Sequence, residues 1–113
     1  MPKCGGRVVV LFPELDLTAE PSANAWVNGF RYCKEAVPLD YAEYTRERRG
    51  AGCALERSGV LVLPLIPDDP QTITIRLNLN GEPGPTRTFE VELGEVLPDA
   101  NGCRVQYVSF QNI

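Results

Sequence analysis

The most informative absence in this chain of 113 residues is histidine, which does not occur in it. Histidine is the side chain that most often moves protons at neutral pH, and it is a frequent zinc ligand. The four cysteines also form no C-x-x-C pair. These absences argue against a zinc site and a histidine-based catalytic centre. We therefore expect a protein that is not an enzyme and that holds no metal or other cofactor.

Long hydrophobic runs and a basic excess are missing as well. No stretch approaches the roughly 20 apolar residues that a membrane-spanning helix needs, so we expect no transmembrane segment. The chain carries 15 acidic and 11 basic residues, which gives a net charge of −4. Proteins that bind nucleic acids usually present a basic face, so we expect no nucleic-acid partner.

Turn-forming residues are abundant, and they separate short apolar runs. The ten glycines and ten prolines fall mostly between these runs, a distribution typical of many short strands. Residues 71–79 alternate strictly between apolar and polar side chains, which predicts a half-buried strand. Further strands are predicted over residues 7–12, 59–66, 86–93 and 103–110.

Two Asn-Gly pairs predict hairpins, because both residues tolerate positive φ. Asn28-Gly29 lies between Trp26-Val27 and Phe30, which favours a compact hairpin. Asn80-Gly81 follows the strand over 71–79. We expect that second hairpin to have more than two loop residues, because Pro83 and Pro85 follow and lengthen the loop.

Together these patterns predict an all-β fold. We expect an antiparallel β-sandwich of about seven short strands, immunoglobulin-like or transthyretin-like in outline. The last three strands are expected to form an antiparallel meander or part of a Greek key. A single domain over residues 7–113 is expected to follow a flexible N-terminal segment over residues 1–6.

Residues 38–50 fit two structures equally well. As a helix, Asp40 would be the N-cap and Glu43 would lie at the third helical position, the arrangement of a capping box. As a strand, Leu39, Tyr41 and Glu43 would alternate with the residues between them. The possible short helix near 40–49 is therefore left open against a strand.

The four cysteines, at positions 4, 33, 53 and 103, favour an oxidising compartment. A disulfide that joins Cys33 to Cys53 or to Cys103 would link neighbouring strands or loops. The alternative is a set of reduced, buried thiols in a cytoplasmic protein. The chain begins without an apolar leader, so an exported protein would have lost its signal segment.

Cys4-Gly5-Gly6 resembles the first residues of a mature bacterial lipoprotein, in which the cysteine carries the lipid. The resemblance implies that Cys4 is a lipid anchor. In that case at most one disulfide is left among the other cysteines. The alternative is an ordinary cysteine in a flexible terminus.

Trp26, the single tryptophan, also has two interpretations. Aromatic side chains in a hairpin usually plug the core or pair across strands. The functional alternative is an exposed aromatic platform for a sugar or a peptide.

Arginines concentrate in one part of the chain, with two tyrosines close by. Arg and Tyr dominate the hot spots of protein interfaces, so this segment is a candidate surface for a protein or an anionic ligand. The alternative is a solvated arginine-rich turn, offset by Glu43, Glu47 and Glu56. The candidate residues are Tyr41, Tyr44, Arg46, Arg48, Arg49 and Arg57.

These observations favour a non-enzymatic binding or assembly module outside the cytoplasm, in the periplasm or at the cell surface, with a lipid anchor as an option. A cytoplasmic location is the alternative. Three other functions stay open. One is an inhibitor that blocks a secreted enzyme with a rigid loop such as Asn80 to Pro85, another is an enzyme that uses carboxylates or arginine, and the last is a structural subunit of a virion or pilus.

Overall fold

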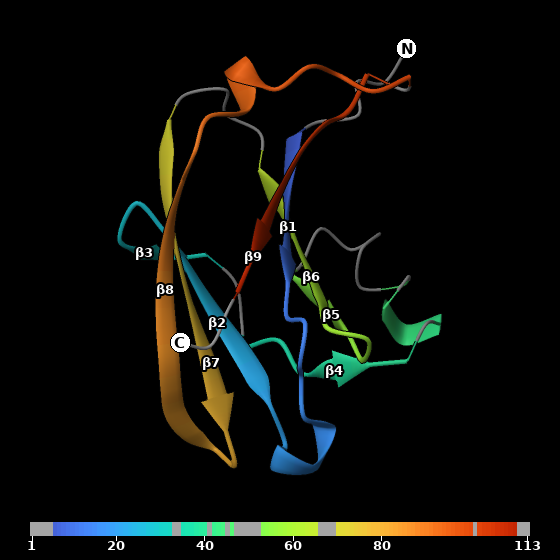
Figure 1. Cartoon of the computed structure of the whole chain (residues 1–113), viewed down its shortest axis with the longest axis vertical. Coiled ribbons are helices and arrows are strands. Elements are labelled where there is room, and N and C mark those ends of the chain that lie inside the picture. The colour runs from blue at the N-terminus through green and yellow to red at the C-terminus, as the bar shows by residue number, and fades with distance from the viewer. Residues whose placement is uncertain are drawn as a thin grey trace.

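The structure is a computed structural model that describes residues 6–32, 35–40, 42–44, 46, 53–65, 70–100 and 102–110. It is mostly β-strand, and its strands form two sheets that face each other without closing into a barrel (Figure 1). The five-stranded sheet has the order β4 (Pro38–Leu39), β5 (Ala54–Glu56), β6 (Val60–Leu65), β1 (Gly6–Leu11) and β9 (Arg104–Ser109). The four-stranded sheet has the order β3 (Phe30–Arg31), β2 (Ser22–Val27), β7 (Gln71–Leu79) and β8 (Glu82–Val91). Two short 3-10 helices, η1 (Leu17–Ala19) and η2 (Leu93–Glu95), lie between strands.

The chain passes repeatedly from one sheet to the other. It begins in the five-stranded sheet with β1, and β2 and β3 then enter the other sheet. It returns with β4 to β6, leaves again with β7 and β8, and ends with β9 beside β1. The predicted all-β, sandwich-like class is therefore confirmed.

The predicted pairing direction is wrong at two places. β1 pairs with β9 in parallel, and β4 pairs with β5 in parallel, whereas the remaining strand pairs are antiparallel. A tight hairpin forces two strands to run antiparallel, but neither parallel pair is joined by a hairpin. The chain enters β9 from β8, which lies in the other sheet. The direction of β9 is therefore set by this connection between the sheets and not by a hairpin turn.

The expected number and order of strands also need correction. The described residues form nine strands instead of about seven. Two of the nine, β3 and β4, are only two residues long, and the sequence pattern does not reveal strands of that length. The last three strands are not a meander, since β9 leaves the sheet of β7 and β8. The segment between β8 and β9 is long enough to carry the chain from one sheet to the other at one end of the molecule (Figure 1).

The β7–β8 hairpin is tighter than predicted. Leu79 pairs with Glu82, so Asn80 and Gly81 alone form the turn, with φ of 54° and 79°. Pro83 and Pro85 lie inside β8 and not in a loop. Both are tolerated there because β8 is at the edge of its sheet, where a missing backbone N–H need not break a pairing.

Asp40 begins a helical turn, which decides between the two alternatives for this segment. Residues 42–44 and 46 are helical. The backbone N–H of Glu43 donates to the Asp40 carboxylate at 2.9 Å, and that of Tyr44 donates to the Asp40 carbonyl at 2.8 Å. This is the N-cap arrangement that the helical alternative predicted.

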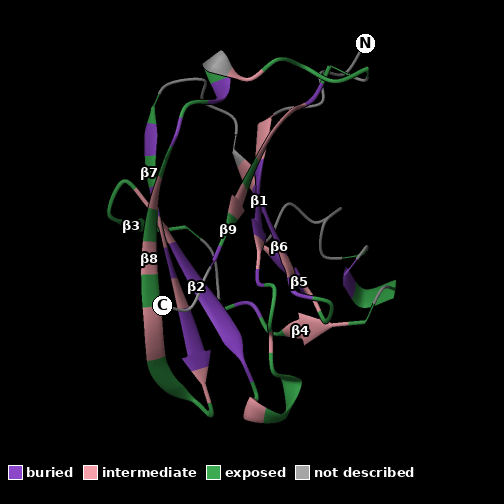
Figure 2. Cartoon of the chain, viewed as in Figure 1, coloured by how far each residue is buried: buried purple, intermediate pink, exposed green. Residues whose placement is uncertain are grey.

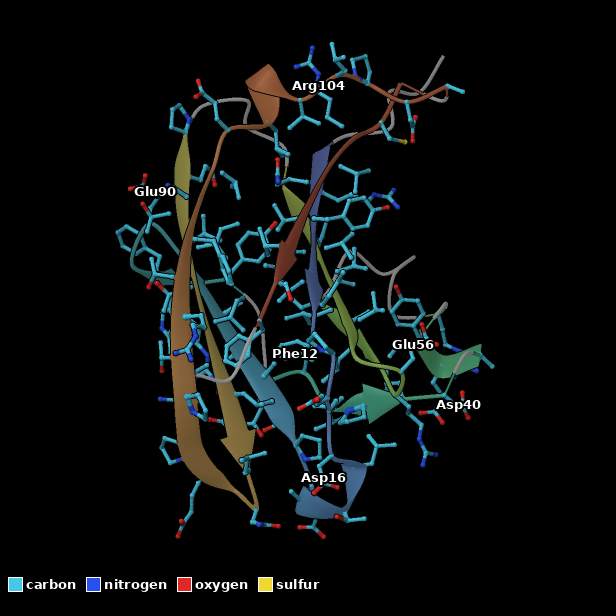
Figure 3. All side chains as sticks on the ribbon, viewed as in Figure 1. Phe12, Asp16, Asp40, Glu56, Glu90 and Arg104 are labelled. Carbon is cyan, nitrogen blue, oxygen red and sulfur yellow. The ribbon has the colours of Figure 1, made fainter. Side chains whose placement is uncertain are left out.

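The main core lies between the two sheets (Figure 2). Its largest fully buried members include Leu55, Leu61, Leu63, Ile73 and Ile75. Complete burial of each such side chain contributes about 1.5–3 kcal/mol. Phe12 points into the space between the sheets and stacks on Phe110 with ring centroids 5.0 Å apart (Figure 3).

A second, smaller apolar cluster covers the outer face of the five-stranded sheet. It contains Val9, Ala54 and Val62, with Tyr44 from the helical turn above them. Val9 faces this cluster because its neighbours Val8 and Val10 point into the main core. The helical turn is therefore held on the sheet by Tyr44.

Candidate functional site

The predicted arginine–tyrosine surface is only partly described. Arg46 and Arg57 are exposed, whereas the Tyr44 side chain is 6% exposed and belongs to the outer apolar cluster. Tyr44 is therefore a packing residue and does not present its ring to a partner. Three other members of that surface, Tyr41, Arg48 and Arg49, lie outside the described residues.

Two of the four cysteines are described, and both are in disulfide bonds. Cys53 is half-buried and Cys103 is buried, and each is disulfide-bonded. Cys4, the predicted lipid anchor, and Cys33, a predicted disulfide partner, lie outside the described residues. The pairing therefore stays a prediction.

A groove of about 410 Å³ lies at the end of the molecule where η1 and the β7–β8 turn come together. Two of its side chains are large, apolar and exposed: Leu17 is 37% exposed and Val37 is 52% exposed. Charged groups of both signs stand beside them. The lining residues are Leu17, Glu20, Pro21, Ser22, Glu35, Val37, Pro38, Arg57 and Gly81.

The η1 wall of the groove is fixed by short-range hydrogen bonds. The Asp16 carboxylate accepts the Thr18 backbone N–H at 3.0 Å and the Thr18 hydroxyl at 2.6 Å (Figure 3 labels Asp16). These bonds lower the pKa of Asp16, the hydroxyl having the larger effect. Glu20 ends η1 in the left-handed region with φ of 45°. The Asn80 N–H donates to the Ala19 carbonyl at 2.8 Å, which ties η1 to the β7–β8 turn.

The opposite wall is the segment that leads into β4. Ala36 and Ala23 exchange two backbone hydrogen bonds of 2.8 and 2.9 Å, which fix this segment against β2. Val37 follows directly and stays exposed. The Arg57 N–H donates to the Leu39 carbonyl at 3.1 Å, so the backbone that carries the groove's arginine is also anchored.

A polar network extends from the groove along the outer face of the four-stranded sheet. Asn78 donates from Nδ2 to the Ser22 hydroxyl at 3.2 Å and to the Asn24 Oδ1 at 2.7 Å. Arg76 donates from Nε to the Asn78 Oδ1 at 2.9 Å and from Nη2 to the Asn24 Oδ1 at 3.2 Å. Ser22 belongs to both the network and the groove, so the network supports the groove floor.

Trp26 is covered by this network on one side of its ring. The Arg76 guanidinium carbon lies 5.2 Å from the ring centroid, within cation–π range. Trp26 is half-buried, and it pairs across the sheet with Thr74 on one side and Arg31 on the other. One face of the ring is therefore occupied by arginine, which favours the packing interpretation over an open aromatic platform.

The carboxylates form no metal-binding cluster within the described ranges. No group of three or more His, Cys, Asp or Glu side chains in them could hold an ion. The Asp99 carboxylate instead accepts the Cys103 backbone N–H at 2.9 Å, and the Asp99 carbonyl accepts the Gly102 N–H at 3.0 Å. This is a turn. Within the same described ranges, no helix has the length and apolar character to span a bilayer.

The groove was not predicted from the sequence. Its walls come from η1, the segment before β4, the β5–β6 turn and the β7–β8 turn, which are far apart along the chain. The sequence signal for the groove is weak: Leu17 and Val37 are single apolar residues, and they follow Asp16 and precede Pro38 respectively.

Comparisons with known proteins give no information on the function of this chain. No family model, curated protein or solved structure gives a significant match to this chain.

Proposed function

We propose that this protein is a non-enzymatic binding module that works outside the cytoplasm and engages a partner protein at the groove. The observation that carries the proposal is the pair of exposed apolar side chains, Leu17 and Val37, set among charges of both signs on a fixed backbone frame.

The chemistry of the groove indicates what the partner would present. Burying Leu17 and Val37 against an apolar side chain would remove exposed apolar surface from water, the main driving force of association. Glu20 and Glu35 offer two carboxylates to a basic group, and Arg57 offers a cation to an acidic group. A partner segment with an apolar anchor flanked by a Lys or Arg fits this pattern.

The absence of histidine from the chain supports a non-enzymatic role, because general acid–base catalysis at neutral pH usually recruits it. The alternative of an enzyme inhibitor has less support, because it depended on a rigid loop from Asn80 to Pro85. Asn80 to Pro85 is not an extended rigid loop, since only Asn80 and Gly81 lie outside the strands. Arg46 and Arg57 stay candidate contacts for an anionic group.

The location outside the cytoplasm is supported by the disulfide-bonded Cys53 and Cys103, since disulfides persist mainly in oxidising compartments. We propose the periplasm or cell surface. A lipid anchor at Cys4 requires that Cys53 and Cys103 pair with each other, because a lipidated Cys4 cannot join a disulfide. Mass spectrometry of the protein from its own host should show a lipid-sized increment on a chain that begins at Cys4, with few free thiols under denaturing, non-reducing conditions. An unmodified chain with four free thiols would contradict this location.

We further propose that the outline of the fold is immunoglobulin-like or transthyretin-like. The repeated passage of the chain between two facing sheets supports this assignment.

Binding of the partner should depend on the two apolar side chains of the groove. We expect Leu17→Glu and Val37→Glu each to weaken the affinity by about tenfold to a hundredfold, because each replaces an apolar contact by a charge. The partner would be isolated from an envelope extract of the producing cells on immobilised protein, purified, and titrated against each variant by calorimetry.

Leu97→Glu is the matched control, because Leu97 is 88% exposed but does not line the groove. It should leave the affinity unchanged. Equal loss of affinity in all three variants, or no loss in either groove variant, would rule out the groove as the binding site.

A further inference from the structure

The four strands at the edges of the two sheets differ in how they are protected against pairing with another chain. β3 and β4 have two residues each, too few for a stable ladder. β8 is long, but Pro83, Pro85 and the charged Glu82 and Glu90 interrupt its edge, a common form of protection. β9 has six residues, no proline and one charged residue, Arg104.

The hydrogen-bond phase of β9 shows which of its backbone groups face outward. The Phe110 N–H donates to the Leu11 carbonyl at 2.7 Å. In a parallel ladder every second residue bonds to the neighbouring strand, so Gln106 and Val108 also point their N–H and C=O groups towards β1. The backbone groups of Val105, Tyr107 and Ser109 therefore point towards the free edge.

One side-chain hydrogen bond agrees with this pattern. The Gln106 side chain donates from Nε2 to the Tyr107 carbonyl at 3.2 Å, so that carbonyl is not used by β1. Among the described residues, no strand pairs with β9 on this side. Three residues of β9 thus carry backbone donors and acceptors that another strand could use.

The Tyr107 side chain is exposed where a partner strand would lie. Tyr107 is 63% exposed and pairs with Val9, so it shares the outer face of the five-stranded sheet with the outer apolar cluster. Val105 is partly buried against the same cluster. Tyr107 is a large aromatic side chain at the rim of this cluster and remains open to solvent.

We propose that β9 pairs antiparallel with β9 of a second copy of this chain, about a two-fold axis at Tyr107. In this register Tyr107 stands opposite its own counterpart, and Val105 stands opposite Ser109 of the second copy. The two five-stranded sheets would then form one continuous sheet. The proposal rests on the free edge of β9 and is independent of the groove.

The chemistry of the strand favours a second copy over an unrelated extended peptide. A two-fold interface must be self-complementary, and like charges directly opposite each other destabilise a strand pair. Arg104 is the only charged residue of β9, and in this register it does not face its own counterpart. The paired tyrosines would also bury an aromatic surface that the single chain leaves exposed.

The test is sedimentation equilibrium of the full chain over a hundredfold range of concentration. A single strand pair is smaller than the roughly 800 Å² per partner of a standard interface, so we expect a dimer that dissociates on dilution. Tyr107→Lys and Tyr107→Glu should each be monomeric where the wild type is dimeric. An equimolar mixture of the two should restore the dimer, because the opposed charges then attract.

Phe30→Lys is the matched control, since Phe30 is an aromatic residue that is 79% exposed on β3. It should dimerise like the wild type. A wild type that is monomeric throughout would overturn the proposal, as would Tyr107 variants that dimerise normally. A dimer that is lost in Leu17→Glu but kept in Tyr107→Lys would place self-association in the groove and would also overturn it.

Discussion

Replacing Gly59 with alanine is expected to lower the free energy of unfolding by at least about 3 kcal/mol, a large part of the total stability of a small domain. Gly59 has φ of 99°, a conformation that side chains with a Cβ rarely adopt. A Cβ atom there would lie 2.4 Å from the Phe12 carbonyl oxygen. The two backbones cannot separate cheaply, because the Phe12 N–H donates to the Gly59 carbonyl at 2.7 Å.

Gly29→Ala is the control that separates the steric clash of an added Cβ atom from the cost of positive φ. Gly29 has a similar φ of 86°, but a Cβ atom there would meet nothing within 4 Å. This variant should lose only about 1–2 kcal/mol, the usual cost of the left-handed conformation. Both values would come from denaturant unfolding followed by circular dichroism. Equal losses in the two variants would mean that Gly59 and Phe12 are not in the close contact described.

Replacing Asn78 with alanine is expected to cost about 2–3 kcal/mol and to change the environment of Trp26. Asn78 is 4% exposed and holds Ser22, Asn24 and Arg76 through its amide. Its removal leaves buried polar groups with fewer partners, and such groups are costly. The Nδ2 of Asn24 already has no partner in the described network, so the remaining residues have little capacity to compensate.

The single tryptophan makes the second effect measurable. Arg76 is held over Trp26 by Asn78 and Asn24, so its release should shift the fluorescence emission of the folded protein. Thr88→Ala is the control, because the exposed Thr74–Thr88 contact of 3.3 Å should contribute within about 0.5 kcal/mol. An Asn78→Ala variant with unchanged stability and emission would mean that the network does not hold Arg76 in place.

The sequence predicts the strands and turns that depend only on the order of neighbouring residues. β7 covers residues 71–79, because strict alternation matches one buried and one outer face. The turn between β2 and β3 uses Asn28 and Gly29 with φ of 53° and 86°, as an Asn-Gly pair favours. The strand predicted over residues 103–110 contains β9, in which Val105 contacts the outer cluster while Val108 contacts the main core.

The sequence did not predict features that depend on contacts between distant segments. The parallel direction of β9 beside β1 follows from the chain's crossing between sheets, which leaves no mark on the apolar pattern of either strand. The sequence places the prolines of β8 in a loop, because their tolerance at a sheet edge depends on which strand becomes the edge. The prediction that Tyr44 lies on the surface is wrong, since its burial depends on contacts with Val9, Ala54 and Val62.

The most direct test of the account is a photo-crosslinking phenylalanine analogue placed at Val37, in the groove, and separately at Thr88, on the outer face of β8. Irradiation of the producing cells should join the chain with the analogue at position 37 to one defined protein partner. The chain with the analogue at position 88 should not form that adduct. The same adduct from both positions, or an adduct from position 88 alone, would contradict the assignment of the groove as the binding site.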